Sequence, residues 1–315
     1  MKKNTYSIVS TIVFLLFSGL SFTSCNSNEE AVVPINIPTD DAECCSAEET
    51  FLAYTFLHNG YLKEIESLRD TIDGKYALSV YSRAGKLHVG YNDIFFALTK
   101  ISNQGFVRDL SVTEITPLMT MSAMGMKHST PTALESTTYD ESFPAVQHAW
   151  VSFVMSSTEN DYWELSYKAG TGKQSAIHES SRLQVDAIAA GQTWLKSFKV
   201  GDDTFYLSLV NPTDWQTGRN TIQAYVSKKS TPATAPYTLA SETFVIGIDP
   251  RMPDMGSHTS PDNTPLIKQA DGSYQGNINL TMTGLWRIHL TVKDAEGNVV
   301  AGEKELSSLY WDVTI

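Results

Sequence analysis

Cysteine is nearly absent from this chain of 315 residues, which has only Cys25, Cys44 and Cys45. A fold held together by a framework of disulfides is therefore excluded. Basic residues are also scarce: 23 Lys and Arg face 35 Asp and Glu, and the net charge is −12. Loss of Lys2 and Lys3 with an export signal would make the mature chain more negative. Because such a surface repels phosphate backbones, we expect no nucleic-acid partner.

Motifs of common hydrolases and nucleotide-binding enzymes are missing as well. The chain contains neither a Gly-x-Ser-x-Gly elbow nor a His-Glu-x-x-His pattern. The segment Gly170–Lys173 lacks both the upstream glycine and the following Ser or Thr of a phosphate-binding loop. The sequence therefore predicts a protein that is not an enzyme.

Long apolar runs are limited to one, from Ile8 to Leu20. It follows two lysines and is too short to span a membrane comfortably, which is typical of a cleaved export signal. Residues Ser21–Cys25 resemble a bacterial lipobox, although Phe22 stands where such motifs usually carry an aliphatic residue. An ordinary secretory signal, cut nearby, is the alternative.

We therefore predict a signal peptide over 1–24, acylation of Cys25 and a polar tether over 25–50. Several acyl chains on Cys25 would hold the protein on a membrane. The acidic segment Asn26–Glu30 is similar to the tether of many Bacteroidota surface lipoproteins. The expected location is the cell envelope, as an outer membrane lipoprotein on the periplasmic or the surface face.

Cys44 and Cys45 are adjacent in a polar segment, so a bond between them would be strained and easily reduced. We favour this vicinal disulfide without a metal role, since an exported protein meets oxidising conditions. Two alternatives stay open: pairing with another chain, or a pair of thiolate ligands for copper.

Strand patterns follow from Tyr76 onward. Phe205–Val210 and Trp286–Val292 place a large apolar residue at every second position, as half-buried strands do. No sustained helical stripe follows the signal, and Phe51–Leu68 fits either a strand and turn or a short helix. The predicted fold class is all-β, with two tandem immunoglobulin-like β-sandwich domains over 51–170 and 171–315, divided at a glycine-rich stretch.

Methionine is concentrated in two patches that recur about 130 residues apart. The first, Pro117–Pro131, aligns with the second, Pro250–Pro261. The alignment pairs Met121 with Met252, Met124 with Met255, and His128 with His258. Further matches lie upstream and downstream, which indicates a tandem repeat rather than coincidence.

Thioether sulfur is a soft ligand and imidazole a borderline one, so these patches suit Cu(I). The predicted function is binding of this ion by an exported lipoprotein for copper handling, with transfer to a partner protein. The candidate metal ligands are Met119, Met121, Met124, Met126, His128, Met252, Met255 and His258.

The alternative is a structural or protein-recognition lipoprotein whose methionines pack in the core or form a contact surface for a cell-surface protein. Met155 and Met282 lie in strand patterns, where we expect core packing. The remaining histidines are expected on the surface, namely His58, His88, His148, His178 and His289. Of these, only His148 is added as a further candidate metal ligand.

The two halves resemble YtkA-like domains, which are related to the FixH type. The second half carries the whole pattern: Gly218 with Asn220, Met252–Met255, Gly272–Tyr274, and Met282-Thr-Gly284-Leu-Trp286. The first half lacks the Met-Pro pair and the glycine before Trp163. The resemblance implies an immunoglobulin-like sandwich and, for some relatives, copper handling outside the cytoplasm.

Overall fold

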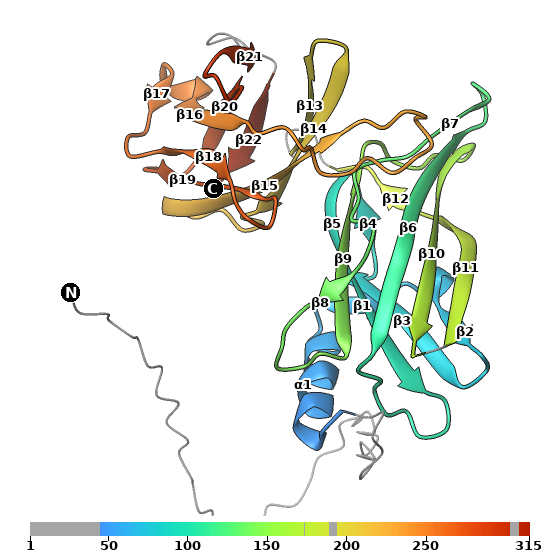
Figure 1. Ribbon diagram of the computed structural model, residues 1–315. Helices are drawn as coiled ribbons and strands as arrows, with labels where there is room; N and C mark the ends of the chain where they lie inside the picture. Colours follow the sequence, from blue (N-terminus) through green and yellow to red (C-terminus); the bar gives the residue numbers. More distant parts are fainter. Residues whose placement is uncertain (1–44, 173, 189–193, 303–308) are drawn as a thin grey trace, which may run out of the picture. The chain divides into compact units, whose positions relative to one another are not determined.

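The computed structural model describes residues 45–172, 174–188, 194–302 and 309–315. Within these ranges one α-helix and two single-turn 3₁₀ helices accompany a chain that is otherwise strand and loop (Figure 1). The all-β prediction is confirmed.

The first sandwich has two main sheets. One has the order β1-β3-β5-β9-β8, with β2 also paired to β3, and the other has the order β11-β10-β6-β7. A short parallel pair, β12 with β4, lies outside both. The bounds are β1 Leu62–Glu64, η1 Glu66–Leu68, β2 Asp70–Ile72, β3 Tyr76–Arg83, β4 Leu87–His88, β5 Gly90–Lys100, β6 Leu110–Met121, β7 Met126–His128, β8 Thr137–Thr138, β9 Val146–Phe153, β10 Asp161–Thr171, β11 Gln174–Leu183 and β12 Val185–Asp186.

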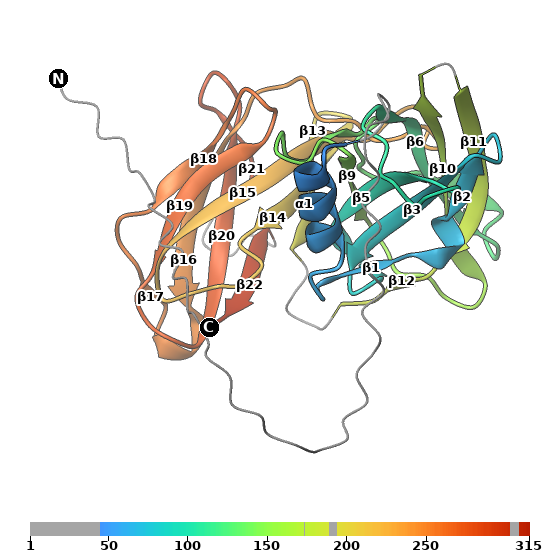
Figure 2. The same cartoon turned by 90° about the horizontal axis from the view of Figure 1, so that it is seen from below.

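The second sandwich is one continuous sheet in the order β13-β14-β15-β19-β18-β16-β20-β21, with β17 on β16 and β22 on β20. Strands from both ends contribute to one core, so the sheet turns back over itself (Figure 2). The bounds are β13 Leu195–Val200, β14 Asp203–Asn211, β15 Gly218–Lys228, β16 Val245–Met252, η2 Pro253–Met255, β17 His258–Thr259, β18 Thr264–Lys268, β19 Tyr274–Leu280, β20 Leu285–Lys293, β21 Val299–Ala301 and β22 Tyr310–Thr314.

Each sandwich has its own apolar core, in keeping with the predicted sandwich fold. Alternation accounts for both cores, because buried and partly exposed residues follow one another along β10, β19 and β20. Trp163 belongs to the first core, and Trp286 and Trp311 belong to the second, all three with no exposed surface.

The segment left undecided begins with a helix, α1, over Ala47–Leu57. Ser46 and Glu49 form a reciprocal capping box at its start, and Thr50, Ala53 and Leu57 are buried on one face. The predicted tether over 25–50 is therefore too long, since its last residues are helical. Among the described residues, no helix has the length and apolar character needed to cross a membrane.

The domain boundary predicted at 170/171 is wrong. Strands β10 and β11 form a hairpin there: Gly170 pairs with Ser175, Thr171 pairs with Gln174, and Gly172, next to the end of β10, adopts φ 57°. Strand β11 then runs back along β10, and Leu183 and Val185 complete the first core. The second core begins at Phe198, so the division follows β12. A glycine-rich polar stretch fits a tight turn as well as a linker, and here it is a turn.

The two sandwiches belong to one compact unit and are joined by backbone hydrogen bonds. Ser129 N–H donates to the carbonyl of Ala233. Thr132 N–H donates to the carbonyl of Tyr237 and Tyr237 N–H to that of Thr130, which makes Pro131 and Tyr237 a parallel bridge pair. Nearby, the rings of Trp150 and Tyr225 stack with centroids 4.7 Å apart. The segment that crosses between the sandwiches directly follows His128, at the end of β7.

Candidate functional site

The first methionine patch forms the hairpin β6–β7. Met119 lies opposite His128, and Met121 lies opposite Met126. Because residues two apart on a strand share a face with their cross-strand partners, all four side chains belong to one face of the hairpin. Gly125, with φ 60°, makes the turn possible. The register thus gathers three thioethers and one imidazole at the end of the first sandwich.

The second patch forms the hairpin β16–β17, closed by the 3₁₀ turn η2. Met252 lies opposite His258, and Met255 ends the turn immediately before Gly256, which also has φ 60°. The two hairpins therefore share a methionine opposite a histidine and a Met-Gly turn. Met252 corresponds in position to Met119, because Met119 lies opposite His128 and Met252 lies opposite His258. The predicted alignment of Met252 with Met121 is therefore wrong. The first hairpin has a longer turn, which accounts for the different spacing between the methionine and the histidine in the two hairpins.

Burial divides the candidate methionines into two kinds. Met119 and Met252 are 0% and 4% exposed and belong to the cores. Met124, Met126 and Met255, by contrast, are 58%, 56% and 54% exposed. A methionine gains its stabilising effect from burial, so three exposed thioethers beside histidines contribute little to folding. Met121 is intermediate and packs against the edge of the first core.

A buried tryptophan lies against the histidine of each hairpin. The ring centroids of His128 and Trp163 are 5.5 Å apart at a steep angle, and those of His258 and Trp286 are 6.2 Å apart. Each indole is itself fixed: Trp163 Nε1–H donates to the carbonyl of Met155 at 2.8 Å, and Trp286 Nε1–H to that of Met282 at 2.9 Å. Each imidazole therefore has a fixed indole ring beside it, and the two rings are closer at His128 than at His258.

Both sandwiches also build the start of the central strand in the same way. The Asn92 amide donates to the carbonyls of His88 and Gly90 and accepts from the His88 N–H. Asn220 makes the matching bonds to Gln216 and Gly218. A buried asparagine with its bonding capacity used in this way fixes the loop before the strand. The Gly-x-Asn segments of the two sandwiches therefore have a structural role.

Sequence reasoning missed the role of the two tryptophans and of Gly284. A Cβ added to Gly284 would lie 2.9 Å from Cε of Met252, and its φ is 127°. The glycine therefore leaves room for the end of the Met252 side chain at the start of β20. The Met-x-Gly-x-Trp spacing is the signal from which this packing could have been read.

Other predicted residues fall into three groups. Met155 and Met282 pack against the edges of the cores. His178 is buried and its Nδ1 lies 2.9 Å from Asp70 Oδ2, so the prediction that it is a surface residue is wrong. His289 is partly buried, and this burial lowers its pKa. Cys25 and Cys44 lie outside the described residues, and Cys45 is buried with its side chain close to Arg108. His148 contacts Asp93 at 2.8 Å, away from both hairpins.

In the described part of the chain, His, Cys, Asp and Glu side chains alone do not form a metal site. No group of three or more His, Cys, Asp and Glu side chains is placed there to hold an ion. A metal at either hairpin would therefore depend on thioethers, which hard ions bind weakly.

Gly284→Ala is expected to displace the Met252 side chain and to destabilise the second sandwich by roughly 1–3 kcal/mol. The added methyl group meets Cε of Met252, and the backbone conformation is one that L-residues rarely adopt. Urea unfolding and the ¹³C-methyl resonance of Met252 measure the two effects. Gly297→Ala is the matched control, since its φ is 87° with open space around it. A Met252 resonance that shifts no more in Gly284→Ala than in the control would contradict the packing role.

Comparison with known proteins gives one family match. Residues 199–291 match the family model described as YtkA-like, which confirms the predicted resemblance for most of the second sandwich. The match includes the second hairpin with Met252, Met255 and His258. No curated protein matches the sequence.

Among solved structures, the chain is similar to one described as "invasin: a bacterial integrin-binding protein". The identity is 13%, the alignment covers 76% of this chain and 39% of that chain, and the TM-score is 0.20. The chain thus spans well under half the length of the invasin chain.

Proposed function

We propose that this protein binds the soft ion Cu(I) in the cell envelope through its two methionine–histidine hairpins, one in each sandwich. The observation that carries the proposal is the recurrence of one arrangement: a buried methionine opposite a histidine, with exposed thioethers at the adjoining turn. The YtkA-like match over residues 199–291, in a family associated with copper handling, supports it.

The donor set fits this ion. Two or more neutral thioethers and a neutral imidazole offer soft and borderline lone pairs without adding charge, which suits a monovalent ion of this kind. In the second hairpin the donors would be Met255 and His258 at the surface, with Met252 beneath them. In the first they would be Met124, Met126 and His128, with Met121 and Met119 below.

Trp163 and Trp286 would act as positioning residues. Each indole is a neighbour of one imidazole and would limit the orientations of that ring before the ion arrives. Ligands held in place before binding lose less conformational freedom and therefore bind more tightly. The turn methionines remain accessible, which suits exchange of the ion with a partner protein.

The recognition alternative has one observation in its favour. Met119 and Met252 are core residues, and burial of this kind is what a packing role requires. Under that alternative Met124, Met126 and Met255 would form an apolar contact surface for another protein. Conservative replacement separates the two readings, because leucine preserves the apolar surface and removes the sulfur.

We further propose that the first sandwich is a more divergent copy of the second. Support comes from the matched hairpins, the paired Asn92 and Asn220 loops, and central strands of 11 residues that begin at Gly90 and Gly218. In this proposal the chain is a non-catalytic copper-binding protein with two sites.

The proposed location rests on Cys25 and the preceding apolar run. Cys25→Ser is expected to release the protein from the membrane fraction or to leave an unprocessed precursor, because serine offers no thiol for acylation. Fractionation with immunoblotting measures both. Normal maturation and unchanged membrane partition of the variant would exclude the lipid anchor, while leaving the metal proposal untouched.

A further inference from the structure

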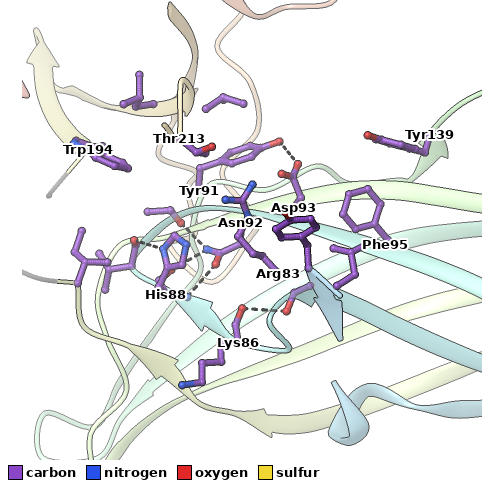
Figure 3. A pocket seen from close by; sticks show the side chains of 18 of the residues that line it. Arg83, Lys86, His88, Tyr91, Asn92, Asp93, Phe95, Tyr139, Trp194 and Thr213 are labelled. Carbon is purple, nitrogen blue, oxygen red and sulfur yellow. Dashed lines mark hydrogen bonds between the residues drawn. The ribbon is translucent and has the colours of Figure 1, made fainter. Parts of the chain in front are cut away.

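A pocket of about 520 Å³ lies beside the start of β5, in the size range of small-molecule sites (Figure 3). The first sandwich contributes the turn from Arg83 to His88 and the first residues of β5. The second contributes Trp194, Thr213 and the end of β14. Neither methionine hairpin takes part, so this pocket is separate from the proposed copper sites.

Aromatic rings form much of the wall. Figure 3 shows Tyr139 and Phe95 on one side, Tyr91 across the middle and Trp194 on the other side. Phe56 and Tyr61 add to this lining. Tyr61 is 75% exposed and Tyr139 45% exposed, so both rings are accessible to a bound molecule. This aromatic lining therefore favours a flat or ring-shaped ligand.

The hydrogen-bond acceptors of the pocket are mostly engaged. The side-chain oxygen of Asn92 accepts from the backbone N–H of His88. The side-chain oxygen of Asn59 accepts from the backbone N–H groups of Tyr61 and Leu62. Asp93 accepts from the Tyr91 hydroxyl at 2.8 Å and contacts His148 Nε2 at 2.8 Å. Burial raises the pKa of Tyr91, so its hydroxyl keeps the proton that it donates. Both contacts to Asp93 use Oδ1, so among these side chains its Oδ2 is the acceptor with the most capacity left within the described residues.

The cationic donors, in contrast, are free. Within the described residues, neither Arg83 nor Lys86 forms an ion pair or a side-chain hydrogen bond, although acids outnumber bases in this chain. Both side chains line the pocket, together with His88, whose Nδ1 contacts the Val89 carbonyl. A pocket with free cations and engaged acceptors is complementary to an anion.

We propose that this pocket binds a small organic carboxylate carried on a ring, with Arg83 pairing with the carboxylate, Lys86 adding a second positive charge to the lining, and the aromatic side chains enclosing the ring (Figure 3). An arginine fork and a lysine point charge together favour a carboxylate over a neutral group. Asp93 is the opposing charge, and its bonds to Tyr91 and His148 partly offset it. An aromatic acid and a sugar acid share this chemistry.

Binding is tested on the purified full chain with matched acid and neutral probes. Benzoate against benzamide represents the aromatic source, and glucuronate against glucose represents the sugar source. Calorimetry or saturation-transfer NMR at millimolar concentrations is expected to show binding of at least one acid. Its neutral counterpart should bind at least about tenfold more weakly, as the loss of a charge-assisted contact predicts.

The double variant Arg83→Gln/Lys86→Gln is expected to reduce acid binding to the level of the neutral probe. Arg219→Gln/Lys199→Gln removes the same charge from exposed strand positions away from the pocket and should bind like the parent. Thermal unfolding of both variants confirms their fold, and Tyr139→Ala should weaken binding without changing charge. Equal binding of acid and neutral probes, parental binding by the Arg83/Lys86 variant, or no binding of either acid would overturn the proposal. Cu(I) binding is expected to be unchanged in all of these variants.

Discussion

The triple variant Met252→Leu/Met255→Leu/His258→Ala is expected to lose Cu(I) binding at the second hairpin, with affinity reduced by more than about a hundredfold. Loss of a residue that merely supports a metal ligand already costs roughly ten- to a hundredfold. Here the proposed ligands themselves are removed, because leucine and alanine offer no lone pair. Competition against a coloured Cu(I) chelator measures the change, while the first hairpin continues to bind.

Single variants separate ligation from packing. Met255→Leu is the cleanest, because its side chain is 54% exposed and its replacement should leave stability unchanged. Met252→Leu conserves volume in the core and should cost less than about 1.5 kcal/mol. Met282→Leu is the matched control, since Met282 packs against the same core outside the hairpin. If Met255→Leu and Met252→Leu bind Cu(I) as tightly as Met282→Leu, the methionines are packing or contact residues.

A fragment that ends at Gly170 is expected to fail to fold cooperatively, whereas one that ends at Asp186 should fold. The shorter fragment lacks β11, which pairs along β10, and loses the buried side chains of Leu183 and Val185. An unpaired edge strand and a core missing two aliphatic residues remove several kcal/mol from a domain whose total stability is of the order of 5–15 kcal/mol. Circular dichroism and urea unfolding distinguish the two fragments.

The complementary fragment from Ala187 to Ile315 contains the whole second core and should unfold in one cooperative transition. Adding β11 and β12 to its amino terminus should not stabilise it, because those strands belong to the first sandwich. A fragment ending at Gly170 that unfolds as sharply as the longer one would contradict the division after β12.

Sequence periodicity predicted the strands because one face of each strand is buried. The same argument does not find α1, whose exposed Phe51 and Tyr54 remove the contrast between its faces. The capping box of Ser46 and Glu49 was the available signal, and it precedes a run of helix-forming residues. Helix caps therefore carried information that hydrophobic pattern did not.

The candidate hairpins were found from composition, but their register was not. Met, Gly and His at similar spacing identified both turns. Which methionine faces the histidine depends on the number of residues in each turn, and the turns differ in length, so Met119 rather than Met121 corresponds to Met252. The contact of Trp163 with His128 depends on packing between strands far apart in sequence.

The pocket beside β5 could not be predicted from sequence at all. Its lining joins the Arg83–His88 turn to Trp194 and the end of β14, and only the fold brings these segments together. Free cations are recognisable only once every ion pair has been assigned, which requires the three-dimensional arrangement of the acids.

The most direct test is a competition titration of the purified chain with Cu(I) under reducing conditions, read against a chelator of known affinity. One ion bound for each hairpin, with the second site lost in the Met252/Met255/His258 variant, is the expected result. Failure of the parent chain to withdraw any Cu(I) from even a weak chelator would contradict the proposed function.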